Sequence, residues 1–275
     1  MKILVFADRN QKEILRDPIS FIFCLGFPVA MLAIFRVISY HTGGHWMKME
    51  QLIPGVAVFG LSFVMLFMTL LVAKDRANSF LTRLYHAPLI TVDFVLGYAL
   101  PGAVLGLIQT QITYVVGALI ALVPNGEVTA KGIAVASKML TSTGYTERAE
   151  LLPWGGIFAA TLAAIPTILF FVACGILLGT LLGERSAPGV SSAIISAAGL
   201  LGGCWMSLDM MGSFEAFCRF LPFYPAVLIS REAFSLSVVQ SGDFAVSLLT
   251  VLLWTALAAT LAVLAFRRGM KGDRR

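Results

Sequence analysis

The sequence predicts an all-α integral membrane protein, and three observations support that fold class. Of the 275 residues, 58% are hydrophobic and only 13% are charged. The mean hydropathy is +0.88, whereas soluble domains are about 45–50% apolar and about 25% charged. The apolar residues also occur in runs long enough to cross a bilayer as helices. A water-soluble fold of this size cannot bury so much apolar surface, so lipid must be the solvent for much of the chain.

Charge and motifs narrow the function classes. The net charge is +5, which we interpret as the Lys/Arg bias of cytoplasmic loops, so no nucleic-acid partner is expected. The chain has no G-x-x-x-x-G-K-[ST] motif to hold ATP phosphates, and its four cysteines form no metal-type cluster with histidine. We therefore expect no catalytic residue, no metal and no cofactor on this chain. Pairing of Cys204 with Cys218 stays open.

The first 17 residues predict an amphipathic helix on the inner membrane surface. Apolar patches at 3–6 and 14–15 flank a charged stretch, as in interfacial helices. A signal peptide is the competing interpretation, but Arg36, rather than a small-residue cleavage site, follows the next apolar run. We expect an interfacial helix over 1–17, followed by a membrane domain over 18–275.

Six apolar runs predict six transmembrane helices with both termini cytoplasmic. The 35-residue third run would make a straight helix of about 52 Å, so it fits one long span or two short spans hinged near Gln109. With six spans, 13 of the 20 Lys and Arg residues fall in short cytoplasmic segments. Splitting the third run would move Arg185 and the basic tail outside, so the charges favour six. The spans are about 18–39, 52–73, 89–123, 151–182, 189–207 and 244–266.

Several segments between the spans carry individual predictions. Residues 208–225 are too polar for a span and too apolar for a free loop. They predict a re-entrant or surface helix at the outer exit, ended by Pro222 and Pro225. Asp93, near the inner start of the third span, is expected to cap a helix or to pair with Arg83.

The order and spacing of several blocks resemble the ABC-2 type permease family, the membrane subunits of bacterial ATP-driven exporters. The most specific block lies within residues 75–88. It begins with an acidic residue, an arginine and a small residue, continues with an Arg-Leu pair, and ends with a proline. The chain departs from the family in lacking a Gly near Asn78 and in its long segment 124–150. The resembling blocks are Arg16-Asp17-Pro18, Pro28, Leu52-Ile53-Pro54-Gly55, Asp75 to Leu84 with Ala87-Pro88, and Leu221-Pro222-x-x-Pro225 with Arg231.

The resemblance implies a drug- or antibiotic-efflux-like permease in the bacterial inner membrane, with two copies of a separate ABC ATPase that holds ATP and Mg. It also implies a second permease chain, which forms either a homodimer or a heterodimer with this one. The expected substrate is an amphipathic small molecule. A polysaccharide or lipid-linked glycan is the alternative substrate class. An ion-coupled secondary transporter is the less favoured alternative, because the spans of this chain show no clear midplane carboxylates or repeated broken helices. An intramembrane enzyme is disfavoured, because Asp93 and Asp209 are expected at opposite membrane faces and form no paired site.

Two residue sets are the candidate sites. The loop 74–88 joins the second and third spans, so it is expected to dock the ATPase; a solvated loop with positive-inside charges is the alternative. Five residues of the second span are candidates for an adaptable apolar substrate cavity, with lipid-facing or core packing as the alternative. The coupling residues are Asp75, Arg76, Phe80, Arg83 and Leu84, with Glu184 and Arg185 of the turn 183–188 as a second contact by analogy. The cavity residues are Phe59, Phe63, Met65, Phe67 and Met68.

Overall fold

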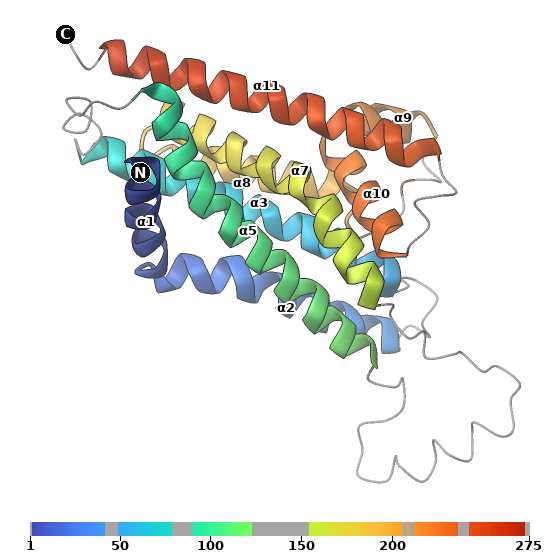
Figure 1. The fold of residues 1–275 in the computed structure, drawn as a ribbon. Helices are drawn as coiled ribbons and strands as arrows, with labels where there is room; N and C mark the ends of the chain where they lie inside the picture. Colours follow the sequence, from blue (N-terminus) through green and yellow to red (C-terminus); the bar gives the residue numbers. More distant parts are fainter. Residues whose placement is uncertain are drawn as a thin grey trace, which may run out of the picture.

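The protein is a bundle of α-helices (Figure 1). A computed structural model describes residues 2–41, 49–78, 90–122, 154–205, 208, 212–235 and 242–272, and no strand occurs in these ranges. The expected all-α class is therefore confirmed for the described chain. Its helices are α1 (Lys2–Leu15), α2 (Pro18–His41), α3 (Met49–Ala77), α5 (Thr91–Leu122), α7 (Trp154–Leu181), α8 (Ala187–Leu201), α9 (Ser213–Phe220), α10 (Phe223–Phe234) and α11 (Gly242–Gly272).

Helices occupy each of the six apolar runs, and four of them are long and apolar enough to cross a membrane. These four lie in α3, α5, α7 and α11. The apolar parts of α2 (Ile22–Ile38) and α8 (Ala187–Leu201) are shorter. An all-α membrane protein is thus supported, while six crossings and the orientation of the termini remain predictions.

The long third run forms one helix rather than two. α5 continues through Gln109, whose side chain is fully buried. The Gln109 amide donates to Thr113 Oγ1 at 3.1 Å and to the Ala57 carbonyl of α3 at 3.4 Å. Because neighbours satisfy this polar group, the helix has no need to break there to reach water. The alternative of a hinge at Gln109 is not observed.

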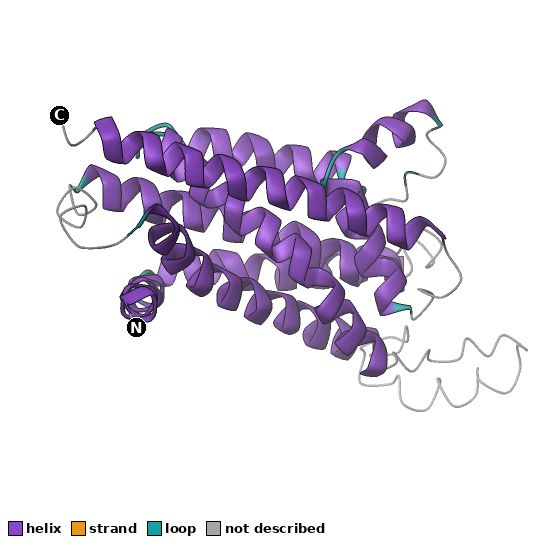
Figure 2. Ribbon diagram, turned by 45° about the horizontal axis from the view of Figure 1, so that its top comes forward, coloured by secondary structure: helices purple, strands orange, loops and turns teal. Residues whose placement is uncertain are grey.

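Helix α3 is the buried centre and α11 lies at the edge. Over its apolar 18-residue stretch, α3 is 83% buried inside the bundle, whereas the corresponding stretch of α11 is 17% buried. α7 approaches α3 closely through Gly175 and Gly179, four residues apart. A Cβ at Gly175 would lie 2.6 Å from the Met65 carbonyl oxygen, and one at Gly179 would lie 2.6 Å from Val72 Cβ. Small residues at this spacing let membrane helices pack backbone to backbone, and Figure 2 shows the long helices running side by side.

The segment before α11 forms two helices. α9 ends at Phe220 as predicted for Pro222, but the prediction that Pro225 also ends a helix is wrong. Pro225 lies in the first turn of α10, where the missing amide hydrogen costs no helical hydrogen bond. Two prolines three apart therefore mark the end of one helix and the beginning of the next.

Candidate functional site

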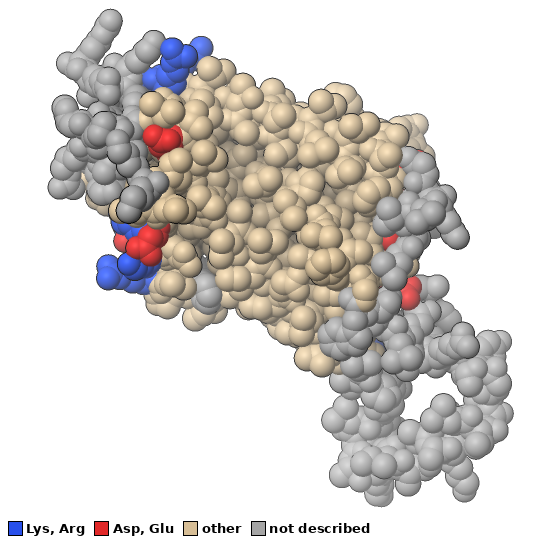
Figure 3. Space-filling view, viewed as in Figure 1, with Lys and Arg blue, Asp and Glu red and all other residues tan. Residues whose placement is uncertain are grey.

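At the end of the bundle where α1 lies, Asp75 forms a buried ion pair with Arg9. On the face seen in Figure 3, the described Lys and Arg side chains gather at this end, and the middle of the bundle is uncharged. Asp75 stands in the last turn of α3, and its side chain is 5% exposed. Arg9 of α1 donates to both carboxylate oxygens, at 2.5 Å and 2.9 Å. This bidentate geometry is the strongest form of the Arg–carboxylate pair.

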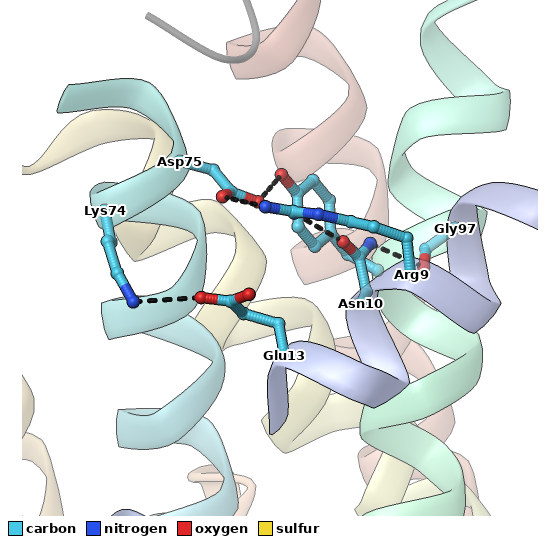
Figure 4. Close-up of polar contacts among 7 residues, drawn as sticks. Arg9, Asn10, Glu13, Lys74, Asp75 and Gly97 are labelled. Carbon is cyan, nitrogen blue, oxygen red and sulfur yellow. Dashed lines mark hydrogen bonds and ion pairs between the residues drawn. The ribbon is translucent and has the colours of Figure 1, made fainter. Parts of the chain in front are cut away.

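Helix α5 supplies a third donor to the same carboxylate. The Tyr98 hydroxyl donates to Asp75 Oδ2 at 2.7 Å, and its side chain is fully buried. A buried carboxylate is tolerated only when its lone pairs are taken up by charged or polar donors. Asp75 therefore joins α1, α3 and α5 at one point (Figure 4).

Asn10 and Phe6 fix α1 to α5 beside this ion pair. The Asn10 side chain is fully buried. It accepts from Arg9 Nη1 at 2.9 Å and donates to the Gly97 carbonyl at 3.0 Å. A Cβ at Gly97 would lie 2.2 Å from the Phe6 ring, so only glycine leaves room for that ring. Phe6 also meets Tyr98 edge-on at 5.0 Å between ring centroids. Helix α1 is thus packed into the bundle through its apolar and uncharged side chains.

A second, exposed ion pair follows on the same two helices. Lys74 Nζ of α3 lies 2.9 Å from Glu13 Oε1 of α1. This hydrogen bond lowers the pKa of Glu13. Likewise, the hydrogen bond to Asp75 raises the pKa of Arg9. Exposed pairs of this kind contribute about 0–1 kcal/mol, so Arg9–Asp75 is the main electrostatic contact between α1 and α3.

Arg76 links α3 to the end of α7. Its guanidinium donates to the Thr180 carbonyl, which lies in the last turn of α7. Carbonyls there have no partner within their own helix and carry partial negative charge, so a cation is favourable. The adjacent residues Asp75 and Arg76 thus point to different helices, and together they tie α1, α5 and α7 to the end of α3.

The predicted coupling residues divide into three groups. Phe80, Arg83 and Leu84 lie outside the described residues. Asp75 is buried in its contacts with Arg9 and Tyr98, so its carboxylate is not exposed to a partner. The others, Arg76, Glu184 and Arg185, are exposed at the α1 end. Sequence reasoning did not single out Arg9, Asn10 or Tyr98; the one available signal was that Asn10 and Gln11 are uncharged within a charged stretch.

Asp93 and the cysteines can also be compared with their predictions. Asp93 Oδ2 accepts from the Ile90 amide at 3.0 Å, so the carboxylate caps the first turn of α5. Arg83, the other predicted partner of Asp93, lies outside the described residues. Cys204 and Cys218 are both buried and unpaired in the structure.

The five candidate cavity residues lie on α3 and are mostly packed within this chain. The Phe59 ring meets those of Trp205 and Phe63 at 4.5 Å and 5.5 Å. Phe59, Met65, Phe67 and Met68 are at most 7% exposed, and Phe63 is partly buried. Met68 packs against Gly175 of α7. Met65 alone of the five also lines a cavity of about 300 Å³ that opens among α7, α8 and α11.

Arg231 holds the opposite end of the bundle together. From α10, its guanidinium donates to the Gln51 carbonyl at 3.0 Å and to the Gly203 carbonyl at 2.8 Å. These carbonyls belong to the first turn of α3 and to the turn after α8. Gly55 of α3 also lies against this turn, because a Cβ there would be 2.2 Å from the Cys204 carbonyl oxygen.

Comparison with known proteins gives one family. The sequence profile of the family described as ABC-2 type transporter matches residues 1–235. This range contains α1 to α10, including both the Arg9–Asp75 ion pair and Arg231. Comparison with curated proteins gave no match.

Proposed function

This chain belongs to the ABC-2 type transporter family, and we propose that it is the permease subunit of an exporter that moves an amphipathic small molecule out of a bacterial cell. A separate ABC ATPase, in two copies, binds ATP and Mg and supplies the energy. A second permease chain completes the pathway. The observation that carries this proposal is the buried ion pair joining α1 to α3 at one end of an apolar bundle.

A permease driven by a soluble ATPase needs rigid contacts that carry movement from its surface into its spans. α1 lies on the surface of the bundle end, with Leu4, Val5 and Leu15 exposed. Through Arg9 it is fixed to Asp75, and through Asn10 it is fixed to α5. In a low-dielectric setting a bidentate charge pair resists separation more strongly than an exposed one. A displacement of α1 would therefore move the ends of α3 and α5 with it.

The ATPase contact is proposed for the segments that leave this cluster. Asp75 and Arg76 end α3 immediately before the loop that carries Phe80, Arg83 and Leu84. The turn 183–188, with Glu184 and Arg185, follows the α7 end to which Arg76 is bound. Both segments are expected to face the cytoplasm, as the Lys/Arg distribution predicts.

The bundle interior favours an amphipathic small molecule over a polysaccharide. The cavity beside Met65 is lined by apolar side chains, whereas a sugar needs hydroxyl, amide or charged partners to replace its water.

Co-expression with an ABC ATPase encoded beside this chain tests the proposal. We expect the ATPase to co-purify and inverted vesicles to take up a fluorescent amphipathic dye only when ATP is present. The purified chain alone should hydrolyse no ATP, because it lacks a phosphate-binding loop. Equal uptake with an ATPase whose phosphate-binding Lys is replaced would refute the proposal.

The contact itself is tested by the double variant Phe80→Ala with Arg83→Glu. We expect loss of dye export and of the co-purifying ATPase, because apolar anchors at interfaces are commonly worth over ~1 kcal/mol and a reversed charge repels an acidic partner surface. Glu184→Ala is the comparison at the smaller predicted contact. A double variant that exports normally and retains its ATPase would move the docking role to the turn 183–188 or to α1.

A further inference from the structure

The cavity of about 300 Å³ lies between four long or apolar helices and the link from α9 to α10. Each element contributes apolar side chains: Met65 from α3, Cys174 from α7, Ile194 from α8, Leu257 from α11 and Pro222 from the link. Water is a poor occupant of such a space, because a buried water needs two to four polar partners.

The link between α9 and α10 lines one side of the cavity with Leu221 and Pro222. The Trp254 indole nitrogen donates to the Phe220 carbonyl at 3.0 Å. Trp254 stands 11 residues after Asp243 in α11, which places it about 16 Å along that helix. The Phe223 ring lies 6.2 Å from that of Phe170 in the middle of α7. Carbonyls in the last turn of a helix have no partner within it, and Trp254 supplies one for Phe220 of α9.

The open side of the cavity faces the surface that lipid covers. Leu257 and Leu261 of α11 both line the cavity and are 48% and 42% exposed. They continue a row of exposed leucines on the same helix, which includes Leu253 and Leu264. Because so little of α11 is buried in the bundle, this row is the part of the chain best suited to contact acyl chains. The cavity is continuous with that lipid contact.

We propose that this cavity is a lateral binding site for one alkyl chain of a bilayer amphiphile, which enters beside α11 beneath Leu221 and Pro222. Its volume is at the lower end of the ~300–1,000 Å³ range of small-molecule sites, so it admits a tail and leaves the polar head at the membrane surface. Met65 is a flexible, unbranched side chain suited to tails of different shape. The inference rests on the proposed exporter function and specifies its substrate class as amphiphiles with an alkyl tail.

Photolabelling of the full chain in vesicles tests the site. The probe is phosphatidylcholine that carries a diazirine near the end of one acyl chain, present at low mole fraction in unlabelled lipid. Peptide mapping after illumination is expected to show several-fold more label at Cys174 and at 257–261 than at 249–253. Excess of an unlabelled single-chain amphiphile should remove the difference.

Two filling variants and one control make the result specific. Cys174→Phe and, as a milder change, Ala258→Leu place extra atoms in the cavity and should abolish the preferential label. Leu253→Phe adds an aromatic ring on the 70% exposed face one turn away and should leave it unchanged. Uniform label along α11, or preferential label that survives both filling variants, would overturn the proposal.

Dye transport separates this inference from the proposed function. ATP-dependent dye uptake in a protein without preferential label would leave the permease assignment in place and refute the tail site. Preferential label in a protein that shows no ATP-dependent uptake with its ATPase would support the tail site and refute the permease assignment.

Discussion

Replacing Asp75 by Asn should destabilise the docking of α1 far more than the same change at Asp8. Both residues pair with a cation of α1, and both changes swap a carboxylate for an amide of equal size. Asp75 is 5% exposed and receives two bonds from Arg9 and one from Tyr98. Asp8 is 61% exposed and pairs along its own helix with Lys12, at 2.7 Å. The two positions therefore differ in burial and in the number of bonds.

The magnitude follows from what each substitution leaves behind. Removing one partner of a buried ion pair costs about 3–5 kcal/mol, because the remaining charge is buried without compensation. The Arg9 side chain is 35% exposed, so it regains part of its hydration, and the new amide still accepts from Tyr98. We therefore expect about 2–3 kcal/mol for Asp75→Asn. Asp8→Asn removes an exposed pair at i,i+4 spacing, worth about 0.3–0.5 kcal/mol.

A double-mutant cycle with Arg9→Gln isolates the pairwise part. The free energy of unfolding is measured in mixed micelles for both single variants and the double variant, with Asp8→Asn as the control. We expect the double variant to cost clearly less than the sum of the two single changes, since the second change removes a charge already left alone. ATP-driven dye export should fall in the Asp75 variant even where membrane insertion is normal. Additive losses, or equal losses at Asp75 and Asp8, would refute the reasoning.

Two other predictions concern topology and packing. Lys131→Cys should react with a membrane-impermeant thiol reagent in intact cells and Lys271→Cys should not, because the basic residues favour a cytoplasmic tail; labelling of position 271 would refute this topology. Gly175→Leu should cost at least about 1–3 kcal/mol by overpacking against α3, since a Cβ there already meets backbone at 2.6 Å. Gly189→Leu, at a site with nothing within 4 Å of the added Cβ, is the matched control in the same unfolding measurement.

The helices were predictable because membrane spans depend on a one-dimensional property. In lipid, the backbone N–H and C=O groups of a long apolar run must bond to one another, and a helix does this within the run. Sequence alone therefore predicts a helix there. Sequence alone does not place helix ends at prolines as well. A proline can follow the end of one helix or stand in the first turn of the next, and both positions lie close together in a chain. Pro222 takes the first position and Pro225 the second.

The polar contacts could not be predicted in the same way. Arg9 and Asp75 are 66 positions apart, and each already had a local explanation. Arg9 fitted the charged face of an interfacial helix, and Asp75 fitted a solvent-facing loop motif. Their pairing depends on how α1 crosses α5, which is decided by the contact of Phe6 with a glycine at position 97. A close approach of that kind leaves no signal in hydropathy or charge.

These contacts make α3 the helix through which movement at one end of the bundle reaches the other. At the α1 end it is held by charge, through Asp75. At the opposite end its first turn is held by Arg231 through a neutral carbonyl. Between them, glycines of α7 bring two backbones into contact, and packed interiors transmit displacement with little compression. The contacts at the two ends differ in kind, since a bidentate charge pair on a buried carboxylate is stronger than a bond to a neutral carbonyl. A force on α1 would therefore keep the Asp75 contact intact and act first on the weaker bonds of Arg231.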